Sequence, residues 1–258
     1  MTALATQVGA VAGRSVRRSL RQPASVIPPL VFPVALLAVN AAGLRPSTQL
    51  PGFPTDSFLA FALAVPFIQG ALFSTMNAGT DLARDIQTGF MNRLSLTALR
   101  DWPLLIGQLG GVVVLGVLQV VFYIAVGLAV GVRFESGFAG ILVLLLYGGI
   151  VALTFGALGA WLAFRTGSGE VIQALFPILF VFLFISSMNA PRNLIGVDWF
   201  RIAATLNPVS YMIEAVRSLI ITGWDWQALG LGFGFVIVLG VIFLALAAHA
   251  LRTRLTRT

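Results

Sequence analysis

Long runs of apolar residues separated by short polar stretches dominate the amino-acid sequence. A helix needs about 20 mostly apolar residues to cross the hydrocarbon core of a membrane. Six runs reach this length, at residues 24–44, 58–80, 103–132, 138–164, 171–190 and 229–251. The pattern predicts an all-α integral membrane protein with six transmembrane helices, organised as a single transmembrane domain over residues 1–258.

The composition supports this prediction. Of the 258 residues, 58% are hydrophobic and only 10% are charged, whereas soluble domains carry about a quarter charged residues. The same figures exclude a disordered chain, which is poor in apolar residues. All sixteen basic residues are arginine, so the chain lacks the lysine of a nucleotide-binding P-loop. Because cysteine is also absent, thiolate chemistry and cysteine-ligated metals are excluded.

The arginines are divided unevenly between the two sides that six spans define. Eleven fall on the side that carries both termini and five fall on the opposite side. Positively charged loops stay in the cytoplasm. We therefore expect a multi-pass protein of the cell (inner or plasma) membrane with both termini cytoplasmic. The formal charge of +7 comes from arginines that lie in short clusters between the apolar runs. Because such clusters set membrane orientation, no nucleic-acid partner is expected.

The residues before the first apolar run, 1–22, follow a helical pattern. Arg14, Arg17, Arg18 and Arg21 form one stripe at helical spacing, with apolar residues on the other side. This pattern predicts an amphipathic helix that lies in the cytoplasmic interface of the membrane. The alternative is a plain positively charged tail that only sets the orientation.

The connection between the second and third runs is the most charged cytoplasmic segment. Gly89 interrupts it, and residues 90–99 are predicted to form a short helix. Phe90, Met91 and Leu94 share one face of that helix. An apolar face exposed to the cytoplasm favours a protein partner, although a helix resting on the bilayer would bury the same face.

The segment before the last run has the start and stop signals of a helix. Asn207 is a favoured N-cap, Pro208 fits the first helical position and Gly223 suits the C-terminal stop. Glu214 and Arg217, three residues apart, are placed to form an ion pair. A helix of about fourteen residues spans roughly 21 Å, which is too short to cross a membrane. We therefore expect a re-entrant helix that dips into the outer leaflet.

No ionisable side chain lies near the middle of any predicted span. A proton- or sodium-coupled carrier commonly needs such a group, so the sequence argues against that class. The only histidine, His249, lies near the end of a span without an acidic cluster, and no HExxH motif is present. We expect no catalytic residue, no metal site and no enzyme activity in this chain.

Two motifs carry a resemblance to a known family. After the second run the chain has Arg84-Asp85, Gly89 and Arg93-Leu94, and before the last run it has Asn207, Pro208, Tyr211, Glu214, Ala215 and Arg217. In this order around six spans, the chain resembles the permease subunits of bacterial ABC exporters, of the daunorubicin-resistance-like and polysaccharide-export-like class. The resemblance covers essentially the whole chain.

This resemblance implies a permease without a cofactor of its own. Two copies of a separate ABC ATP-binding subunit would hold ATP and magnesium, and a second permease copy would complete a homodimer. Residues 1–22 would be the connecting helix and residues 90–99 the coupling helix. The residues that it implies for coupling to the ATPase are Arg84, Asp85, Gly89, Phe90, Met91, Arg93 and Leu94. The residues that it implies for the external re-entrant helix are Asn207, Pro208, Tyr211, Glu214 and Arg217.

In such families the second and fifth spans line the route of the substrate. The resemblance places one wall at Phe67, Gln69, Phe73 and Asn77, and the other at Phe176, Phe180, Phe184 and Met188. Such a lining suits a hydrophobic or amphipathic cargo, and we expect ATP-driven efflux of a drug, lipid or glycolipid-like substrate, with antibiotic resistance as one outcome. The alternatives are an ATP-independent carrier or channel, and a membrane anchor or assembly subunit.

Overall fold

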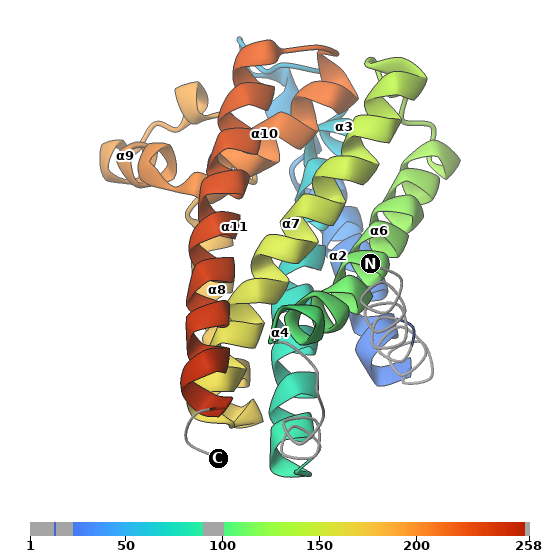
Figure 1. Cartoon of the computed structure of the whole chain (residues 1–258). Coiled ribbons are helices and arrows are strands. Elements are labelled where there is room, and N and C mark those ends of the chain that lie inside the picture. Colours follow the sequence, from blue (N-terminus) through green and yellow to red (C-terminus); the bar gives the residue numbers. More distant parts are fainter. Residues whose placement is uncertain (1–12, 14–22, 90–100, 256–258) are drawn as a thin grey trace.

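The computed structural model describes residues 13, 23–89 and 101–255, and within these ranges the chain is helical and has no strand (Figure 1). Long helices form a bundle, and the shorter ones gather at the end opposite the C-terminus. The helices are α2 (Pro23–Gly43), α3 (Phe58–Ala62), α4 (Ala64–Gln87), α6 (Asp101–Ala129), α7 (Gly137–Thr166), α8 (Gly169–Phe184), α9 (Asp198–Leu206), α10 (Pro208–Ile221) and α11 (Trp226–Leu255), with 3₁₀ turns η1 (Arg45–Gln49) and η2 (Arg192–Leu194). The predicted amphipathic helix, apart from Gly13, and the predicted coupling helix lie outside the described residues.

Five segments are long and apolar enough to cross a membrane, namely Val26–Gly43, Phe58–Gln87, Leu105–Ala129, Gly137–Thr166 and Trp226–Arg254. They correspond to five of the six predicted spans. The run predicted at residues 171–190 is α8, which has only 16 residues and ends at Phe184. A helix of this length extends about 24 Å, less than the roughly 30 Å of a hydrocarbon core. The sixth span therefore stays a prediction.

The second predicted span consists of two helices. α3 begins after Ser57, whose side chain accepts a hydrogen bond from the first turn, and ends at Ala62. Pro66, in the first turn of α4, has no N–H, so it leaves the carbonyl of Ala62 without its usual helical donor. The chain therefore turns at Leu63 before α4 starts. α4 then continues past the predicted end of the span to Gln87.

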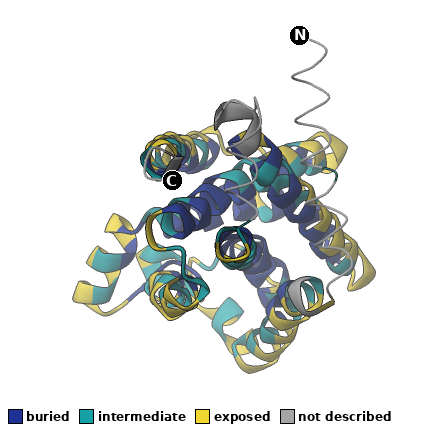
Figure 2. Ribbon diagram, turned by 60° about the horizontal axis from the view of Figure 1, so that its bottom comes forward, coloured by how far each residue is buried: buried dark blue, intermediate teal, exposed yellow. Residues whose placement is uncertain are grey.

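α4 and α7 form the centre of the bundle. In an apolar 18-residue stretch of each candidate span, buried residues make up 83% for the segment that contains α4, 61% for α7 and 17% for α2. Figure 2 shows the buried residues gathered in the middle of the bundle. The two helices touch at Gly79 and Gly159, where a Cβ on Gly159 would lie 2.2 Å from the carbonyl oxygen of Thr75. Thr75 also donates its Oγ1 hydrogen to the carbonyl of Phe155 at 2.9 Å. Small residues and interhelical hydrogen bonds of this kind fix helix crossings in membranes.

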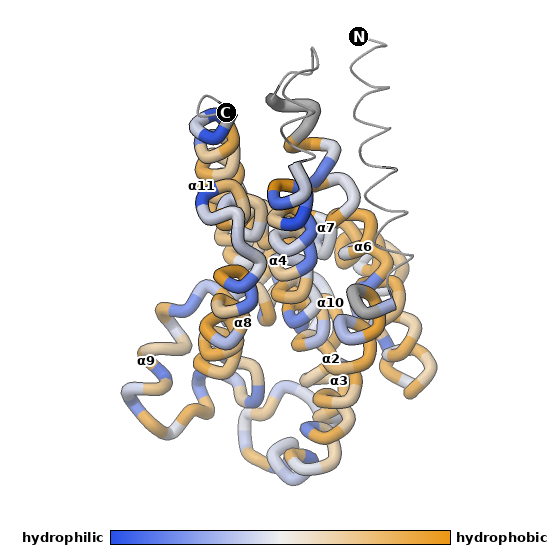
Figure 3. Tube along the Cα trace, turned by 90° about the horizontal axis from the view of Figure 1, so that it is seen from below, coloured by the Kyte–Doolittle hydropathy of each residue, from blue (hydrophilic) through white to orange (hydrophobic). Residues whose placement is uncertain are grey.

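The outer helices expose apolar side chains over most of their length. Val39 on α2, Leu118 on α6, Val181 on α8 and Val241 on α11 are all exposed, and Figure 3 shows hydrophobic residues along most of the bundle. Exposed apolar surface of this extent indicates contact with another apolar phase. Together with the five candidate spans, it indicates a multi-pass membrane protein.

We predict that Gly159→Ala lowers the midpoint of thermal unfolding in detergent, because the new methyl group would overlap the backbone of α4 and overpacking costs about 1–3 kcal/mol. Gly234→Ala is the matched control on α11, since nothing lies within 4 Å of a Cβ at that position. The control is expected to unfold at or above the wild-type midpoint, because alanine is the better helix former. Equal midpoints for the two variants would contradict the tight crossing of α4 and α7.

Candidate functional site

Five phenylalanine rings from three helices form one group, which we call the aromatic cluster: Phe32, Phe73, Phe176, Phe180 and Phe184. On α8, Phe176 and Phe180 have ring centroids 4.7 Å apart, and Phe180 lies 6.1 Å from Phe184. Phe73 of α4 lies 5.1 Å from Phe176. Phe32 of α2 lies 5.9 Å from Phe180 and 6.2 Å from Phe73. The three rings on α8 line up because residues four apart share a helix face.

The aromatic cluster is open on one side. Phe32 is 45% exposed and Phe184 is 49% exposed, whereas Phe73, Phe176 and Phe180 are partly buried. The rings meet at tilted or edge-on angles, which are the preferred arrangements of aromatic pairs. An open row of rings in this geometry can accept a further planar apolar group without a change in the rings already present.

An unpaired polar group lies next to the cluster. Gln69 of α4 is fully buried, and neither the oxygen nor the nitrogen of its amide has a hydrogen-bond partner among the described residues. A buried polar group left unpaired costs about 1–3 kcal/mol. Because residues four apart share a helix face, Gln69 lies on the side of α4 that carries Phe73.

The other residues predicted for the substrate route lie elsewhere. Phe67 is buried against Tyr123, with ring centroids 5.7 Å apart, and Met188 is buried beyond the end of α8. The structure therefore brings together four of the five predicted phenylalanines of α4 and α8 and adds Phe32. No pattern in the sequence indicates Phe32, because only the packing of α2 against α4 and α8 reveals its position.

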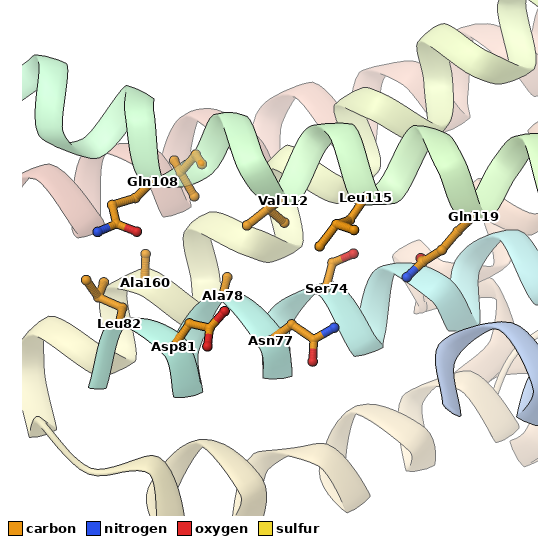
Figure 4. A pocket seen from close by; sticks show the side chains of 11 residues that line it. Ser74, Asn77, Ala78, Asp81, Leu82, Gln108, Val112, Leu115, Gln119 and Ala160 are labelled. Carbon is orange, nitrogen blue, oxygen red and sulfur yellow. The ribbon is translucent and has the colours of Figure 1, made fainter. Parts of the chain in front are cut away.

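Asn77 lines a small cavity between α4, α6 and α7 (Figure 4). Asp81 and Gln119 also line it, and its volume of about 20 Å³ is close to that of one water molecule. No group of three or more His, Asp or Glu side chains in the described residues could hold a metal ion, in this cavity or elsewhere.

The C-terminal end of α4 carries the described part of the predicted coupling residues. Arg84 is exposed, and Asp85 is buried with Gln108 Nε2 3.4 Å from its Oδ2. Gly89 follows the helix with a φ of +69°, which favours glycine and ends α4. The rest of the predicted set, namely Phe90, Met91, Arg93 and Leu94, lies outside the described residues.

Polar side chains fix the point where α8 ends. Asn207 donates its Nδ2 hydrogens to the carbonyls of Phe182 and Ile185, and Ser186 donates its Oγ hydrogen to the carbonyl of Leu183. These carbonyls belong to the last turn and the C-cap of α8, and no N–H group of the same helix is available to them. α8 therefore stops at Phe184, because neighbouring side chains replace the missing turns.

Asn207 has a second role, as the sequence predicted. Its Oδ1 accepts a hydrogen bond from the N–H of Val209 at 2.9 Å and so caps α10, in which Pro208 is the first residue. Gly223, with a φ of +87°, follows the end of the helix. Tyr211 donates its hydroxyl hydrogen to the carbonyl of Thr205 at 2.9 Å. The predicted bounds of this helix are thus confirmed.

The predicted ion pair between Glu214 and Arg217 is wrong, because Glu214 pairs with Arg192 of η2. Arg192 Nε lies 2.8 Å from Glu214 Oε1, and Arg192 Nη2 lies 2.6 Å from Oε2, so the pair is bidentate. Burial lowers the pKa of Arg192, but the carboxylate of Glu214 more than offsets this, and the pKa lies above its ordinary value. The sequence carries no signal for this pair, because its members lie far apart in the chain.

Arg217 is instead buried among backbone carbonyls. Only 5% of it is exposed. Its Nε donates to the carbonyl of Phe61 at 3.1 Å, and its Nη2 donates to those of Ser187 at 3.0 Å and Met188 at 3.1 Å. The guanidinium also lies 3.5 Å from the ring centroid of Phe61. One side chain of α10 thereby joins α3 to the segment that follows α8.

Comparison with known proteins identifies this architecture. Residues 6–221 match the family described as ABC-2 type transporter, which is most of the chain. The chain therefore belongs to the ABC-2 type transporter family. It is a permease subunit, and membership of the family implies an ABC ATP-binding subunit as its partner.

Individual relatives of this ABC-2 permease are distant. It is 29% identical over 171 residues to the daunorubicin resistance ABC transporter permease protein DrrB1 of Streptomyces coeruleorubidus, a match that covers 64% of the chain but only 58% of that relative. It is 27% identical over 223 residues to the ycf38 protein of Pyropia yezoensis, itself only provisionally named a transport permease, with 84% of the chain and 74% of the relative covered. The ycf38 protein of Porphyra purpurea is 26% identical over 91% of the chain and 85% of its own length.

We predict that Asn207→Asp destabilises the permease at least as much as Asn207→Ala, although aspartate and asparagine are equally good N-caps. The reason is that the lost bonds are those of the amide nitrogen to two carbonyls of α8, and a carboxylate in its place would face those oxygens. The measurement is the midpoint of thermal unfolding in detergent. If Asn207→Asp kept the wild-type midpoint, the cap of α10 alone would explain this residue.

Proposed function

We propose that this ABC-2 permease is the membrane part of an ATP-driven exporter that moves a hydrophobic or amphipathic substrate, such as a drug, lipid or glycolipid-like molecule, out of the cytoplasm or the inner leaflet. The aromatic cluster is the observation that carries this proposal. It is an open row of five rings on α2, α4 and α8, adjacent to a buried amide without a partner. The daunorubicin-resistance relative supports the same substrate class.

The cluster and Gln69 together would select an amphipathic cargo. The rings of Phe73, Phe176 and Phe180 would contact its apolar part, since aromatic faces and edges pack well on other rings. The amide of Gln69 offers both a donor and an acceptor. A polar group of the cargo that reached this amide would remove the unfavourable free energy of its unpaired state.

A second copy of the chain would close the open side of the cluster. The face of α8 beside it exposes Ile178, Val181 and Phe182, and interfaces between permanent partners are apolar in this way. In such a homodimer the two aromatic clusters would face a common route. The 16-residue α8 would line this route and would therefore not need to be long enough to cross the lipid.

α4 gives a direct mechanical link from the ATPase to this route. Gln69 and Phe73 lie in its first half, and the helix runs without a break to Gln87, immediately before the predicted coupling helix at residues 90–99. Because α4 is packed on most sides by its neighbours, a displacement of its cytoplasmic end would move the residues of the cluster. ATP binding by the two partner subunits would supply that displacement.

We predict that Phe90→Asp uncouples ATP hydrolysis from transport, because a charge would disrupt the apolar contact expected with the ATP-binding subunit. The permease and its copurifying ATP-binding subunit would be reconstituted in liposomes, with ATP-dependent uptake of daunorubicin into inside-out vesicles as the readout. Phe90→Leu is the conservative control and is expected to retain most of the transport. Transport that persists without any ATP-binding subunit would refute the exporter and favour an ATP-independent carrier.

A second prediction concerns the substrate route. Phe180→Ala should reduce ATP-dependent transport by about fivefold, since one lost ring contact with a ligand is worth about 1 kcal/mol. Phe138→Ala is the matched control, because Phe138 of α7 is exposed and lies outside the aromatic cluster. A loss in Phe138→Ala as large as that in Phe180→Ala would show that the aromatic cluster has no particular role in transport.

A further inference from the structure

A second pocket lies at the end of the bundle opposite the C-terminus, between η2, α10 and the start of α11. Its volume is about 420 Å³, within the range of small-molecule sites. Arg192, Glu214, Arg217, Asp225 and Ala228 are among the residues that line it. The aromatic cluster contributes none of its residues to this pocket, so the pocket is separate from the proposed substrate route.

The charges that line this pocket are not equally available to a ligand. Glu214 is occupied on both oxygens by Arg192. Asp225 accepts hydrogen bonds on Oδ1 from the backbone N–H groups of Gln227 and Ala228, at 3.0 Å each, and so caps α11. Both carboxylates therefore have structural partners, and they leave the positive charge of Arg217 without a carboxylate in contact.

Arg217 still has hydrogen-bond donors to offer. Its bonds to the carbonyls of Phe61, Ser187 and Met188 use Nε and Nη2, and Nη1 makes no hydrogen bond with the described residues. A guanidinium presents five N–H donors in a planar fork that matches carboxylate and phosphate oxygens. A buried cation whose free donors border a pocket is well suited to bind an oxyanion.

Two tryptophans indicate the depth of this pocket. Trp224 and Trp226 flank Asp225, are exposed, and stack with ring centroids 5.5 Å apart. Tryptophan is enriched at the level of the lipid headgroups. At that depth the abundant oxyanion is the phosphate of a phospholipid, and a guanidinium fork matches the geometry of phosphate oxygens.

We propose that this pocket binds the phosphate group of a membrane phospholipid, with Arg217 as the residue that donates to it. The lipid would come from the leaflet on the α10 side of the bundle. Its headgroup would stabilise the α3, α8 and α10 junction by completing the hydrogen bonds of Arg217. This inference does not depend on what the permease transports.

Native mass spectrometry of the purified permease, together with its ATP-binding subunit, tests the proposal. One phosphatidylglycerol per chain is expected to bind about tenfold more tightly than diacylglycerol with the same acyl chains, because only the former carries the oxyanion. Ala228→Phe, which would place a ring in the pocket while keeping Arg217 in the sequence, should weaken phosphatidylglycerol binding by a similar factor. Ala245→Phe is the control on the exposed face of α11 and should bind like the wild type.

Arg217→Met extends the test to the guanidinium itself, and any variant that elutes as an aggregate is left out of the comparison. Equal binding of the two lipids, or unchanged phosphatidylglycerol binding by Ala228→Phe, would overturn the proposal. Displacement of the lipid by millimolar inorganic phosphate would keep the oxyanion site but overturn the lipid as its source. Retained phosphatidylglycerol in the presence of phosphate, lost only in the pocket variants, is the expected result.

Discussion

A buried guanidinium holds together the end of the bundle where the helices are interrupted. In a membrane, a backbone carbonyl without a donor costs several kcal/mol, so helices can break only where another group supplies the missing hydrogen. Arg217 supplies it at two breaks at once, to Phe61 before α4 and to Ser187 and Met188 after α8. Arg217 thereby links α3, α8 and α10, and the bonds from Asn207 to two carbonyls of α8 hold α8 and α10 together as well.

The same constraint explains most of the polar side chains inside the bundle. Pro33 has no N–H for the carbonyl of Pro29, and the hydroxyl of Tyr123 donates to that carbonyl instead. Asn207 and Ser186 likewise donate hydrogen bonds to carbonyls at the end of α8. Against this background Gln69 stands apart, because its buried amide serves no backbone group in the described part of the chain. This is the amide that the proposed substrate would contact.

The structure thus separates a rigid part from an open part. α4 and α7 are locked together by a close glycine contact and an interhelical hydrogen bond, whereas the face that α2 and α8 share exposes aromatic and aliphatic side chains. Only α4 belongs to both parts, since it is central and also carries Phe73. In the proposed mechanism, α4 would transmit motion from the ATP-binding subunit to the rings of the aromatic cluster. The ABC-2 family assignment gives that ATPase as the partner.

The sequence by itself determined the class of protein, five of the spans, the absence of a P-loop lysine and the bounds of α10. These follow from local physics, namely the length of apolar runs, a capping asparagine, the fixed φ of proline and the backbone freedom of glycine. Tertiary structure alone decided that α8 stops at Phe184, that Glu214 pairs with Arg192, and that Phe32 joins the rings of α4 and α8. Each of these depends on residues far apart in the chain that meet only after packing, and the spacing of residues along one helix carries no information about such partners.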